Sequence, residues 1–512
     1  MPLWLALVLP ALPLQLAARA APLPGPLAVV DGRAQRPVVA CCNDAARAAG
    51  IYPGLKLAAA QALAPHLAAV QRRPEREADE LQALACWAYQ FSAQIVVRDD
   101  RGGSGLLLET GASERLFAGR RPLHRHLARG LRELGYRSAF GYAVTPRAAW
   151  LVACARAQGL PATDAWTAED LHAAAAPLPP ALLDWDDEAC SALHALGLTT
   201  LHDLLRLPRA AFARRFGAAR LDDLDRAFGR VPDPQPPFVP PARFACTIDL
   251  PADLADAQQL TFPAHRLLRQ LEGFLRGRAA GAAELLFSAQ HSARRQAPVP
   301  PTPIELRLAA PERQAARLAR LFEERLARIR LPAPAVALTL AVEQLLPYAA
   351  ASASLLPPAP GRHGGGWLQL AETLHARFGS ARVFQLQAVD DHRPEHALRV
   401  LPLAPDAGQP PAAAAAARRP LLLIERPVPL ACLGGGDPAA EAAPDYGGPL
   451  RLLAGPERIE AGWWDRTSAA FGQPRAAVQR DYFVARNPRG QTLWIYRELQ
   501  APRHWFLHGL FA

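Results

Sequence analysis

The chain has 512 residues, and half of them are hydrophobic, which is enough for several cores and predicts about three or four domains. Its formal net charge is +10 and rests almost entirely on arginine, because Lys56 is the only lysine. Arginine suits phosphate contacts, but a GC-rich genome would give the same bias, so charge alone does not establish a nucleic-acid partner. The seven cysteines form no Cys-x-x-Cys pair, which indicates neither a zinc site nor a redox motif and fits a reduced cytosolic protein.

The amino-terminal segment is apolar, and no acidic residue occurs before Asp31. It ends in Ala18-Arg19-Ala20, which looks like a signal-peptidase site, but no basic residue precedes the apolar run and two prolines interrupt it. The run from Leu3 to Leu9 is also too short to span a bilayer. We therefore expect a buried first strand, and neither secretion nor a membrane partner.

Residues 1 to about 165 alternate short apolar runs with helical patterns. The periodicity predicts strands at 37–40, 94–97 and 105–108, and helices at 55–69 and 76–92. Elements that alternate in this way indicate an α/β or α+β domain.

Residues 178–230 have the pattern of short helices separated by glycine turns. One helix stops at Gly197 and the next begins after Thr200, a typical N-cap; a second unit turns at Gly217, directly after Arg214 and Arg215. Such a helix-hairpin-helix-like element can offer backbone N–H groups to a DNA phosphate. The alternative is an ordinary small helical bundle.

A proline-rich joint then separates residues 242–343, whose pattern reads strand, helix, strand, strand, helix, strand. This order is typical of a small split sheet of ferredoxin-like type. Many arginines accompany it, and Arg294 and Arg295 are candidates for contact with a DNA backbone. The alternative is that these arginines only cover solvated faces.

The last third divides into two parts. Residues 344–446 are rich in Pro, Ala and Gly and predict a linker. Residues 447–512 are dense in aromatics, with strands expected at 482–484 and 493–496 around an Asn487–Gly490 turn. We expect a small β module that docks a partner.

Two stretches of this tail, residues 455–464 and 505–512, carry a family resemblance. On these motifs the chain resembles the ImuB family, the polymerase-like subunits of bacterial mutagenic repair complexes. Residues 3–340 are similar in order to the palm, fingers, thumb and little finger of Y-family (lesion-bypass) DNA polymerases. The resemblance implies palm and fingers at 1–165 (fingers about 36–75), thumb at 166–232, little finger at 242–343, linker at 344–446 and partner-docking module at 447–512. Its docking candidates are Trp463, Trp464, Trp505 and Phe506.

An active Y-family enzyme holds two divalent metals on four carboxylates, which activate the primer 3′-hydroxyl. Alignment with that family puts Val8 and Pro10 at the aspartate positions of the first strand, and Ser104 and Gly105 at the later Asp-Glu pair. All four acids are replaced, and Asp99 and Asp100 lie five residues too early. Of the triphosphate contacts, only Arg47 is retained. We expect no bound metal and no cofactor.

The resemblance therefore implies a non-catalytic DNA-binding scaffold of damage-induced translesion synthesis, cytoplasmic and associated with the nucleoid. Its expected partners are primer-template or damaged DNA, the sliding clamp, an error-prone C-family polymerase and the RecA-like accessory protein ImuA. Two alternatives remain: an active Y-family polymerase with displaced metal ligands, and a protein-only hub that no longer touches DNA.

Clamp-binding peptides use a Gln anchor followed by a pair of apolar groups. One candidate is formed by Gln344, Leu345 and Tyr348, and a second by Leu355 and Leu356, where Ser replaces the Gln. Both depart from the usual Gln-x-x-Leu-Phe pattern. The alternative is that Leu345 and Tyr348 only pack against the end of the preceding domain, residues 242–343.

Overall fold

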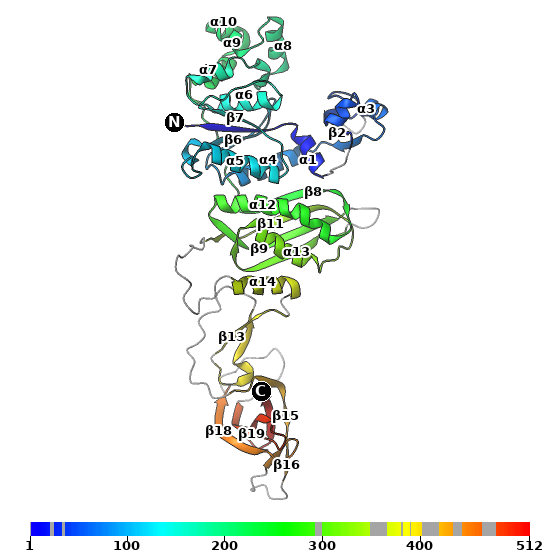
Figure 1. The fold of residues 1–512 in the computed structure, drawn as a ribbon, viewed down its shortest axis with the longest axis vertical. Helices are drawn as coiled ribbons and strands as arrows, with labels where there is room; N and C mark the ends of the chain where they lie inside the picture. Colours follow the sequence, from blue (N-terminus) through cyan, green and yellow to red (C-terminus); the bar gives the residue numbers. More distant parts are fainter. Residues whose placement is uncertain are drawn as a thin grey trace. The chain divides into compact units, whose positions relative to one another are not determined.

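The computed structural model describes residues 2–20, 25–32, 36–291, 299–348, 366–379, 382–389, 391–401, 419–433, 443–462 and 478–511. It divides into two compact units, Met1–Arg377 and Phe378–Ala512. The first holds the palm, fingers, thumb and little finger, and the second a β-sheet module (Figure 1). The multidomain α+β fold class expected from the sequence is confirmed.

The palm is an antiparallel sheet of strand order β5-β6-β1-β7, with β1 in an inner position. Side chains from α4 and α5 pack on one face of it and α6 on the other, so every residue of β1 is buried. A strand buried on both faces reads as a continuous apolar run, which explains residues 4–9. The elements are β1 (Trp4–Leu9), α4 (Pro74–Ala88), β5 (Ile95–Asp100), β6 (Gly103–Glu109), α5 (Arg120–Glu133), β7 (Ala139–Ala143) and α6 (Pro146–Ala157).

The fingers are a three-stranded sheet, β3-β2-β4, packed with short helices. The expected helix at 55–69 was too long: α3 ends at Leu63, and Ala68–Gln71 form β4, parallel to β2. The reason is Pro65, which disfavours helical backbone at Ala64, where φ is −136° and ψ is 95°. The elements are α1 (Leu12–Ala20), β2 (Leu27–Asp31), β3 (Val38–Cys42), α2 (Asp44–Ala48), α3 (Leu57–Leu63) and β4 (Ala68–Gln71).

The thumb is helical, and its core joins that of α6. Thr200 caps α9 as expected, in a capping box with Asp203. The helices are α7 (Asp170–Ala175), α8 (Asp187–Ala195), α9 (Leu201–Leu205), α10 (Arg209–Phe216) and α11 (Ala218–Ala227).

The little finger has the expected order β-α-β-β-α-β. Its sheet runs β10-β9-β11-β8, with the first strand at an edge and the short β12 paired to β9. Apolar side chains of α12 and α13 build its core against this sheet. The elements are β8 (Phe244–Leu254), α12 (Thr261–Gly277), β9 (Ala280–His291), β10 (Thr302–Glu312), α13 (Ala315–Leu326), β11 (Ala335–Val342) and β12 (Leu346–Pro347).

The predicted linker at 344–446 needs a correction, because its described residues include regular elements. Helix α14 (Gly366–Phe378) docks on the little finger, where buried Glu372 accepts the Ala309 N–H at 2.9 Å and pairs with Arg317. Its Ala371 and Ala376 side chains are buried, an apolar pattern that the Pro/Ala/Gly composition concealed. Strands β13 (Gln385–Ala388) and β14 (Leu398–Leu401) form a hairpin, and β16 (Ala431–Leu433) pairs with β17 (Ala443–Asp445).

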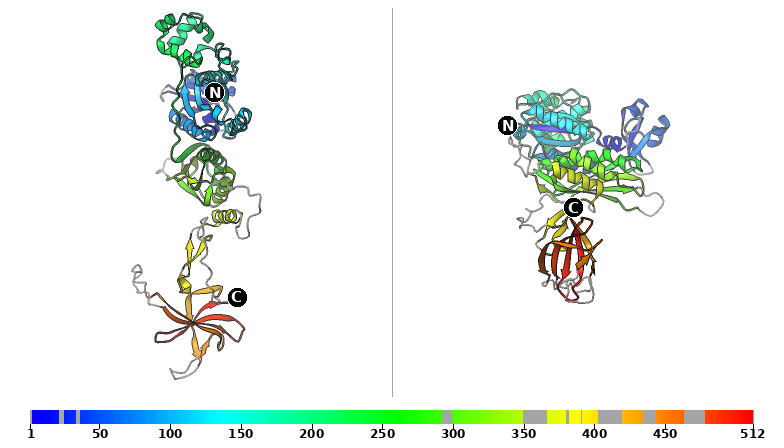
Figure 2. Two further views of the ribbon diagram at one scale, coloured as in Figure 1. Left: turned by 90° about the vertical axis from the view of Figure 1, so that its left-hand side faces the viewer. Right: turned by 60° about the horizontal axis from the view of Figure 1, so that its bottom comes forward.

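The second unit centres on a five-stranded antiparallel sheet, β15-β21-β20-β19-β18, visible in both views of Figure 2. The expected strands and the turn at Asn487–Gly490 are confirmed, but β15 comes from the predicted linker. The strands are β15 (Leu422–Pro429), β18 (Arg451–Ala461), β19 (Val478–Arg486), β20 (Thr492–Glu498) and β21 (Trp505–Leu510).

Little finger and palm share a close helix contact between α12 and α4. The indole of Trp87 on α4 is 4% exposed and lies between two glycines, Gly130 of α5 and Gly273 of α12. A Cβ at either glycine would overlap the indole ring. The absence of both side chains therefore permits the helices to approach.

Within the described ranges, the structure contains no helix that is long and apolar enough to cross a membrane.

Candidate functional site

The first candidate site lies where β1 ends beside the start of β6. The strand register pairs Val8 with Gly105 and Leu9 with Ser104, and Pro10 follows directly. The structure thus brings together the four positions that alignment assigned to metal ligands. Val8 is 1% exposed and packs among core residues shared with α6.

Gly105 leaves no space for a side chain. A Cβ at this position would overlap the carbonyl oxygen of Leu7 on the paired strand. A Cβ at neighbouring Gly103 would lie 2.9 Å from the Val8 side chain. A carboxylate therefore cannot be accommodated at position 105 without moving the backbone of β1.

The nearest acids, Asp99 and Asp100 of β5, are already engaged. Asp99 accepts the Ser104 hydroxyl at 2.6 Å. Asp100 accepts the Trp150 indole N–H at 3.2 Å and forms a 2.7 Å ion pair with Arg98. Magnesium prefers several oxygen ligands in octahedral geometry. Among the residues that the structure describes, no three His, Cys, Asp or Glu side chains cluster as metal ligands, so the residues present do not fit the two-metal centre of an active polymerase.

Arg47 lies on α2 of the fingers and is exposed. Its guanidinium forms a 3.2 Å ion pair with Asp44, and the two side chains are 53% and 89% exposed. An ion pair this exposed is worth little, so Arg47 can exchange Asp44 for another anion at small cost.

The two thumb turns differ in their free hydrogen-bond donors. At the Gly197 turn (φ +72°), the Thr199 and Thr200 N–H groups both donate to the Asp203 carboxylate, at 3.1 and 2.9 Å. A carboxylate therefore already occupies the place that a phosphate would take at this turn.

At the Gly217 turn (φ +92°), the glycine is the N-cap of α11, and no side chain caps the helix. Arg214 and Arg215 are exposed in the last turn of α10, and within the described ranges neither forms an ion pair. This turn combines open N–H donors with two unpaired guanidinium groups, which suits a phosphate backbone.

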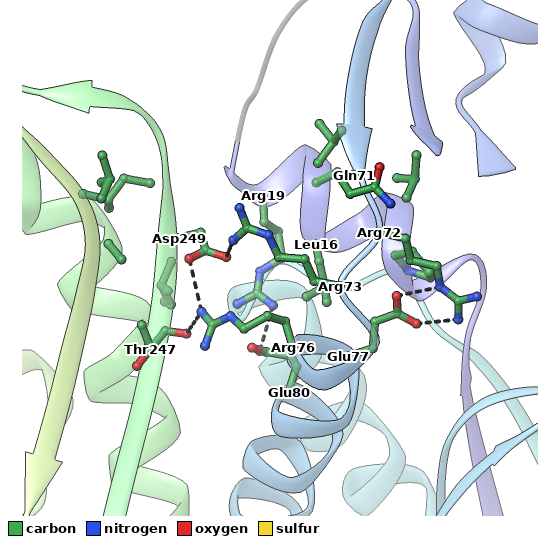
Figure 3. Close-up of a pocket in the computed structure, with 18 residues that line it drawn as sticks. Leu16, Arg19, Gln71, Arg72, Arg73, Arg76, Glu77, Glu80, Thr247 and Asp249 are labelled. Carbon is green, nitrogen blue, oxygen red and sulfur yellow. Dashed lines mark hydrogen bonds and ion pairs between the residues drawn. The ribbon is translucent and has the colours of Figure 1, made fainter. Parts of the chain in front are cut away.

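A cavity of about 410 Å³ lies between α1, the fingers strands, the start of α4 and the little finger (Figure 3). Pro13 of α1 is among the residues that line it. Asp249 of β8 pairs with Arg73 and Arg76 at 3.5 and 3.3 Å, and Arg76 also donates to the Thr247 carbonyl oxygen at 3.1 Å. The arginines at this cavity are therefore largely compensated by acids.

A buried polar network fixes the palm to the little finger beside this cavity. Arg19 pairs with Glu80 at 2.9 Å, and Gln270 of α12 donates to the same carboxylate at 3.1 Å. Burial alone would raise the pKa of Glu80, but the charge of Arg19 and a hydrogen bond from Tyr136 lower the pKa overall. The carboxylate therefore stays ionised and holds both domains.

The first clamp candidate is partly engaged with its own domain. Gln344 is exposed, whereas Leu345 packs against the little-finger core. Tyr348 donates its N–H to the Ala279 carbonyl oxygen at 3.3 Å, and its ring lies 4.3 Å from the Arg313 guanidinium. Leu345 and Tyr348 could therefore enter a partner's pocket only if residues 345–348 detach from the little finger.

Two predicted docking residues belong to the core of the second unit. Trp505 is 8% exposed and packs with Phe483 at a ring distance of 5.3 Å, while half-buried Phe506 stacks on Tyr496 at 5.1 Å. Six other candidates lie outside the described residues: Arg294, Arg295, Leu355, Leu356, Trp463 and Trp464.

Sequence reasoning did not single out a basic surface at the start of α5. Arg120, Arg121 and Arg125 line a hollow there together with Trp166. The spacing Arg-Arg-x-x-x-Arg gave a local signal, but the tryptophan lies 41 residues beyond Arg125 and only the fold brings it near.

Comparison with known proteins gives consistent matches. Residues 14–154 match the impB/mucB/samB family. Two curated relatives, both named Protein ImuB, come from Caulobacter vibrioides strains NA1000 / CB15N and ATCC 19089 / CIP 103742 / CB 15. Each is 32% identical over 491 residues, covering 90% of this chain and all of the relative.

Solved structures give more distant matches. DinB from Sulfolobus solfataricus shares 12% identity at a TM-score of 0.37, over 67% of this chain and 99% of that one. An insertion ternary complex of Dbh DNA polymerase shares 14% identity at a TM-score of 0.36, over 67% of this chain and 99% of that one.

Proposed function

Because this chain belongs to the ImuB family of Y-family polymerase-like proteins, we propose that it is a non-catalytic, DNA-binding scaffold for damage-induced translesion synthesis. The observation that carries the proposal is the packing at positions 8 and 105. One is a buried valine and the other a glycine without space for a side chain, so neither position can supply a carboxylate to a metal ion.

DNA contact is the second part of the proposal. Replacement of four carboxylates at the end of β1 and the start of β6 removes negative charge that would repel a DNA backbone. Arg214 and Arg215 at the Gly217 turn, and Arg47 on the fingers, remain exposed for phosphate contacts. The chain would thus hold primer-template DNA without extending it, within the nucleoid of the cytoplasm.

The third part is recruitment of other proteins. We propose that the scaffold joins the sliding clamp to an error-prone C-family polymerase and to the RecA-like accessory protein ImuA. Tethering raises the local concentration of each partner at the primer end without new chemistry. The second unit and the segment around residues 344–356 are the proposed docking regions.

A reconstituted reaction tests this function. Clamp, C-family polymerase and accessory protein are combined on a primed, damaged template with and without the full chain. The scaffold is supported if lesion bypass by the C-family polymerase increases several-fold when the chain is added. Equal bypass with and without the chain would contradict it.

A comparison of variants in the two candidate segments tests the clamp contact. Gln344→Ala tests the first candidate, and Leu355→Ala with Leu356→Ala tests the second. Because Leu345 and Tyr348 pack on the little finger, we expect clamp capture to depend on the Leu355–Leu356 pair. Loss of capture in Gln344→Ala alone would instead assign the first candidate.

A further inference from the structure

A hollow on the palm, here named the α5 pocket, lies at the start of α5 and at the edge strand β7. It measures about 580 Å³ and is lined by side chains from three separate stretches of chain. They are Arg120, Arg121, His124, Arg125, Tyr142, Asp164 and Trp166. None of them belongs to the degenerate metal site or to the thumb turns.

Trp166 is 42% exposed although its backbone is firmly held. Its N–H donates to the Asp170 carboxylate at 3.0 Å, and the N–H of the preceding Ala165 donates to the Tyr142 carbonyl oxygen at 2.9 Å. The indole rests on the Tyr142 ring at 5.1 Å. The Arg120 guanidinium also lies over this ring at 4.8 Å, and the part of the indole that stays exposed can contact another ring.

Aromatic rings in tilted and edge-to-face contact adjoin the base of the pocket. The Tyr142 hydroxyl lies 3.1 Å from His124 Nδ1, and the His124 ring contacts Phe140 at 4.7 Å. Burial is the main cause that lowers the pKa of His124, so the imidazole is neutral at neutral pH. The positive charge of the pocket therefore comes from its arginines.

Those arginines have few acidic competitors. Arg120 lies 4.8 Å from the Trp166 ring and pairs with Glu114 at 3.2 Å. Arg121 and Arg125 are exposed and form no ion pair within the part of the chain that the structure describes. The one acid of the pocket, Asp164, is neutralised by Arg156 at 2.8 Å.

We propose that the α5 pocket binds single-stranded DNA, with one base stacked on Trp166 and the adjacent phosphates paired with Arg121 and Arg125. Stacking on an aromatic ring beside a basic groove is the general means by which proteins hold single strands without sequence preference. An acidic peptide would satisfy the arginines but would not supply a ring to stack on the exposed part of the indole. The pocket would thus hold an unpaired strand separately from any duplex bound by the thumb.

The experiment measures binding of the full chain to labelled oligo-dT by fluorescence anisotropy across a salt series. Trp166→Ala removes the stacking surface, and we expect roughly ten-fold weaker binding. Arg121→Gln with Arg125→Gln removes two phosphate contacts, and the slope of log K against log salt should fall by about 1.4. Trp166→Phe should retain most of the affinity because it keeps an aromatic face.

Two controls separate this pocket from other effects. Arg129→Gln changes an exposed arginine of the same helix outside the pocket and should leave oligo-dT binding unchanged. Arg214→Gln with Arg215→Gln should weaken binding to primed duplex but not to oligo-dT. The proposal is overturned if Trp166→Ala binds oligo-dT like the unaltered chain, or if polyglutamate binds this pocket and oligo-dT does not.

Discussion

Single residues decide whether the palm can hold metal. Sequence alignment predicted the loss of four carboxylates, but it could not show that a side chain at 105 is sterically excluded. That fact depends on the register between β1 and β6, which sets Gly105 against the backbone at Leu7 and Val8. Packing therefore closes position 105 to a carboxylate, independently of the alignment.

We expect Gly105→Ala to destabilise the palm by about 3 kcal/mol or more, because the new methyl group overlaps the Leu7 carbonyl oxygen. Hydrogen exchange of peptides from β1 and β6 in the full chain measures this directly. Ser104→Ala on the same strand is the control and loses one hydrogen bond, to exposed Asp99. Equal protection in both variants would show that position 105 tolerates a side chain.

His508 makes the second unit sensitive to acid. The imidazole is 2% exposed and lies 2.8 Å from the Tyr482 hydroxyl. Burial lowers its pKa below the unfolded value of about 6.5, so below that pH the unfolded state binds more protons than the folded state. Its contribution to stability is full above about pH 6.5 and is lost as the pH falls toward the lowered pKa.

We therefore expect hydrogen exchange in β20 and β21, corrected for intrinsic rates, to accelerate between about pH 7 and pH 5. His508→Gln should reduce this pH dependence. His504→Gln, which replaces an exposed histidine, should keep it. An unchanged pH response in His508→Gln would assign the acid sensitivity to another group.

At the scale of helices, α4 of the palm packs closely against α12 of the little finger because Gly273 of α12 has no side chain. An alanine is usually favoured over glycine inside a helix by about 1 kcal/mol. At Gly273 a methyl group would overlap the Trp87 indole, so the sign of the effect should reverse. No local pattern predicts this contact, because Trp87 and Gly273 are 186 residues apart.

Gly273→Ala should lower the free energy of unfolding of the full chain by about 1–3 kcal/mol. In the background of Trp87→Leu the same change should cost less, because a smaller side chain leaves space for the methyl group. A double-mutant cycle from urea unfolding of the four proteins gives this coupling. Additive effects would show that Gly273 and Trp87 do not constrain each other.

The two thumb turns differ in their free N–H donors, although the sequence pattern predicted the same phosphate contact at Gly197 and Gly217. Asp203 supplies the difference, because its carboxylate accepts the N–H groups of the first turn. An N-cap at Thr200 was predicted from the sequence, but the competition between Asp203 and a phosphate depends on three-dimensional geometry. The Gly217 turn remains the better candidate for DNA.

For primed DNA we expect Arg214→Gln with Arg215→Gln to reduce the salt slope of binding by about 1.8, since two duplex phosphate contacts are lost. Arg206→Gln, which changes the exposed arginine at the C-cap of α9, is the matched control. An effect of Arg206→Gln as large as that of the Arg214–Arg215 pair would contradict a specific role of the Gly217 turn.

At the scale of the whole molecule, the order of domains followed from periodicity and from the resemblance, because strand and helix patterns are local. Composition misled where local signals were weak: α14 and β15 lie in a region that Pro, Ala and Gly marked as linker. The α5 pocket was missed because it requires Trp166 and Arg121 to meet in the fold. Local elements were therefore predictable, and the resemblance supplied the pairing of residues 8–10 with 104–105, whereas the α5 pocket and the Trp87–Gly273 contact were not predictable.

Primer extension by the pure chain, on a primed template that it demonstrably binds, tests the central claim most directly. With Mg²⁺ or Mn²⁺ and all four deoxynucleotides, we predict salt-dependent DNA binding and no added nucleotide. Template-directed incorporation that disappears in Asp99→Asn or Asp100→Asn would contradict the account, because it would show that displaced acids still seat the metals.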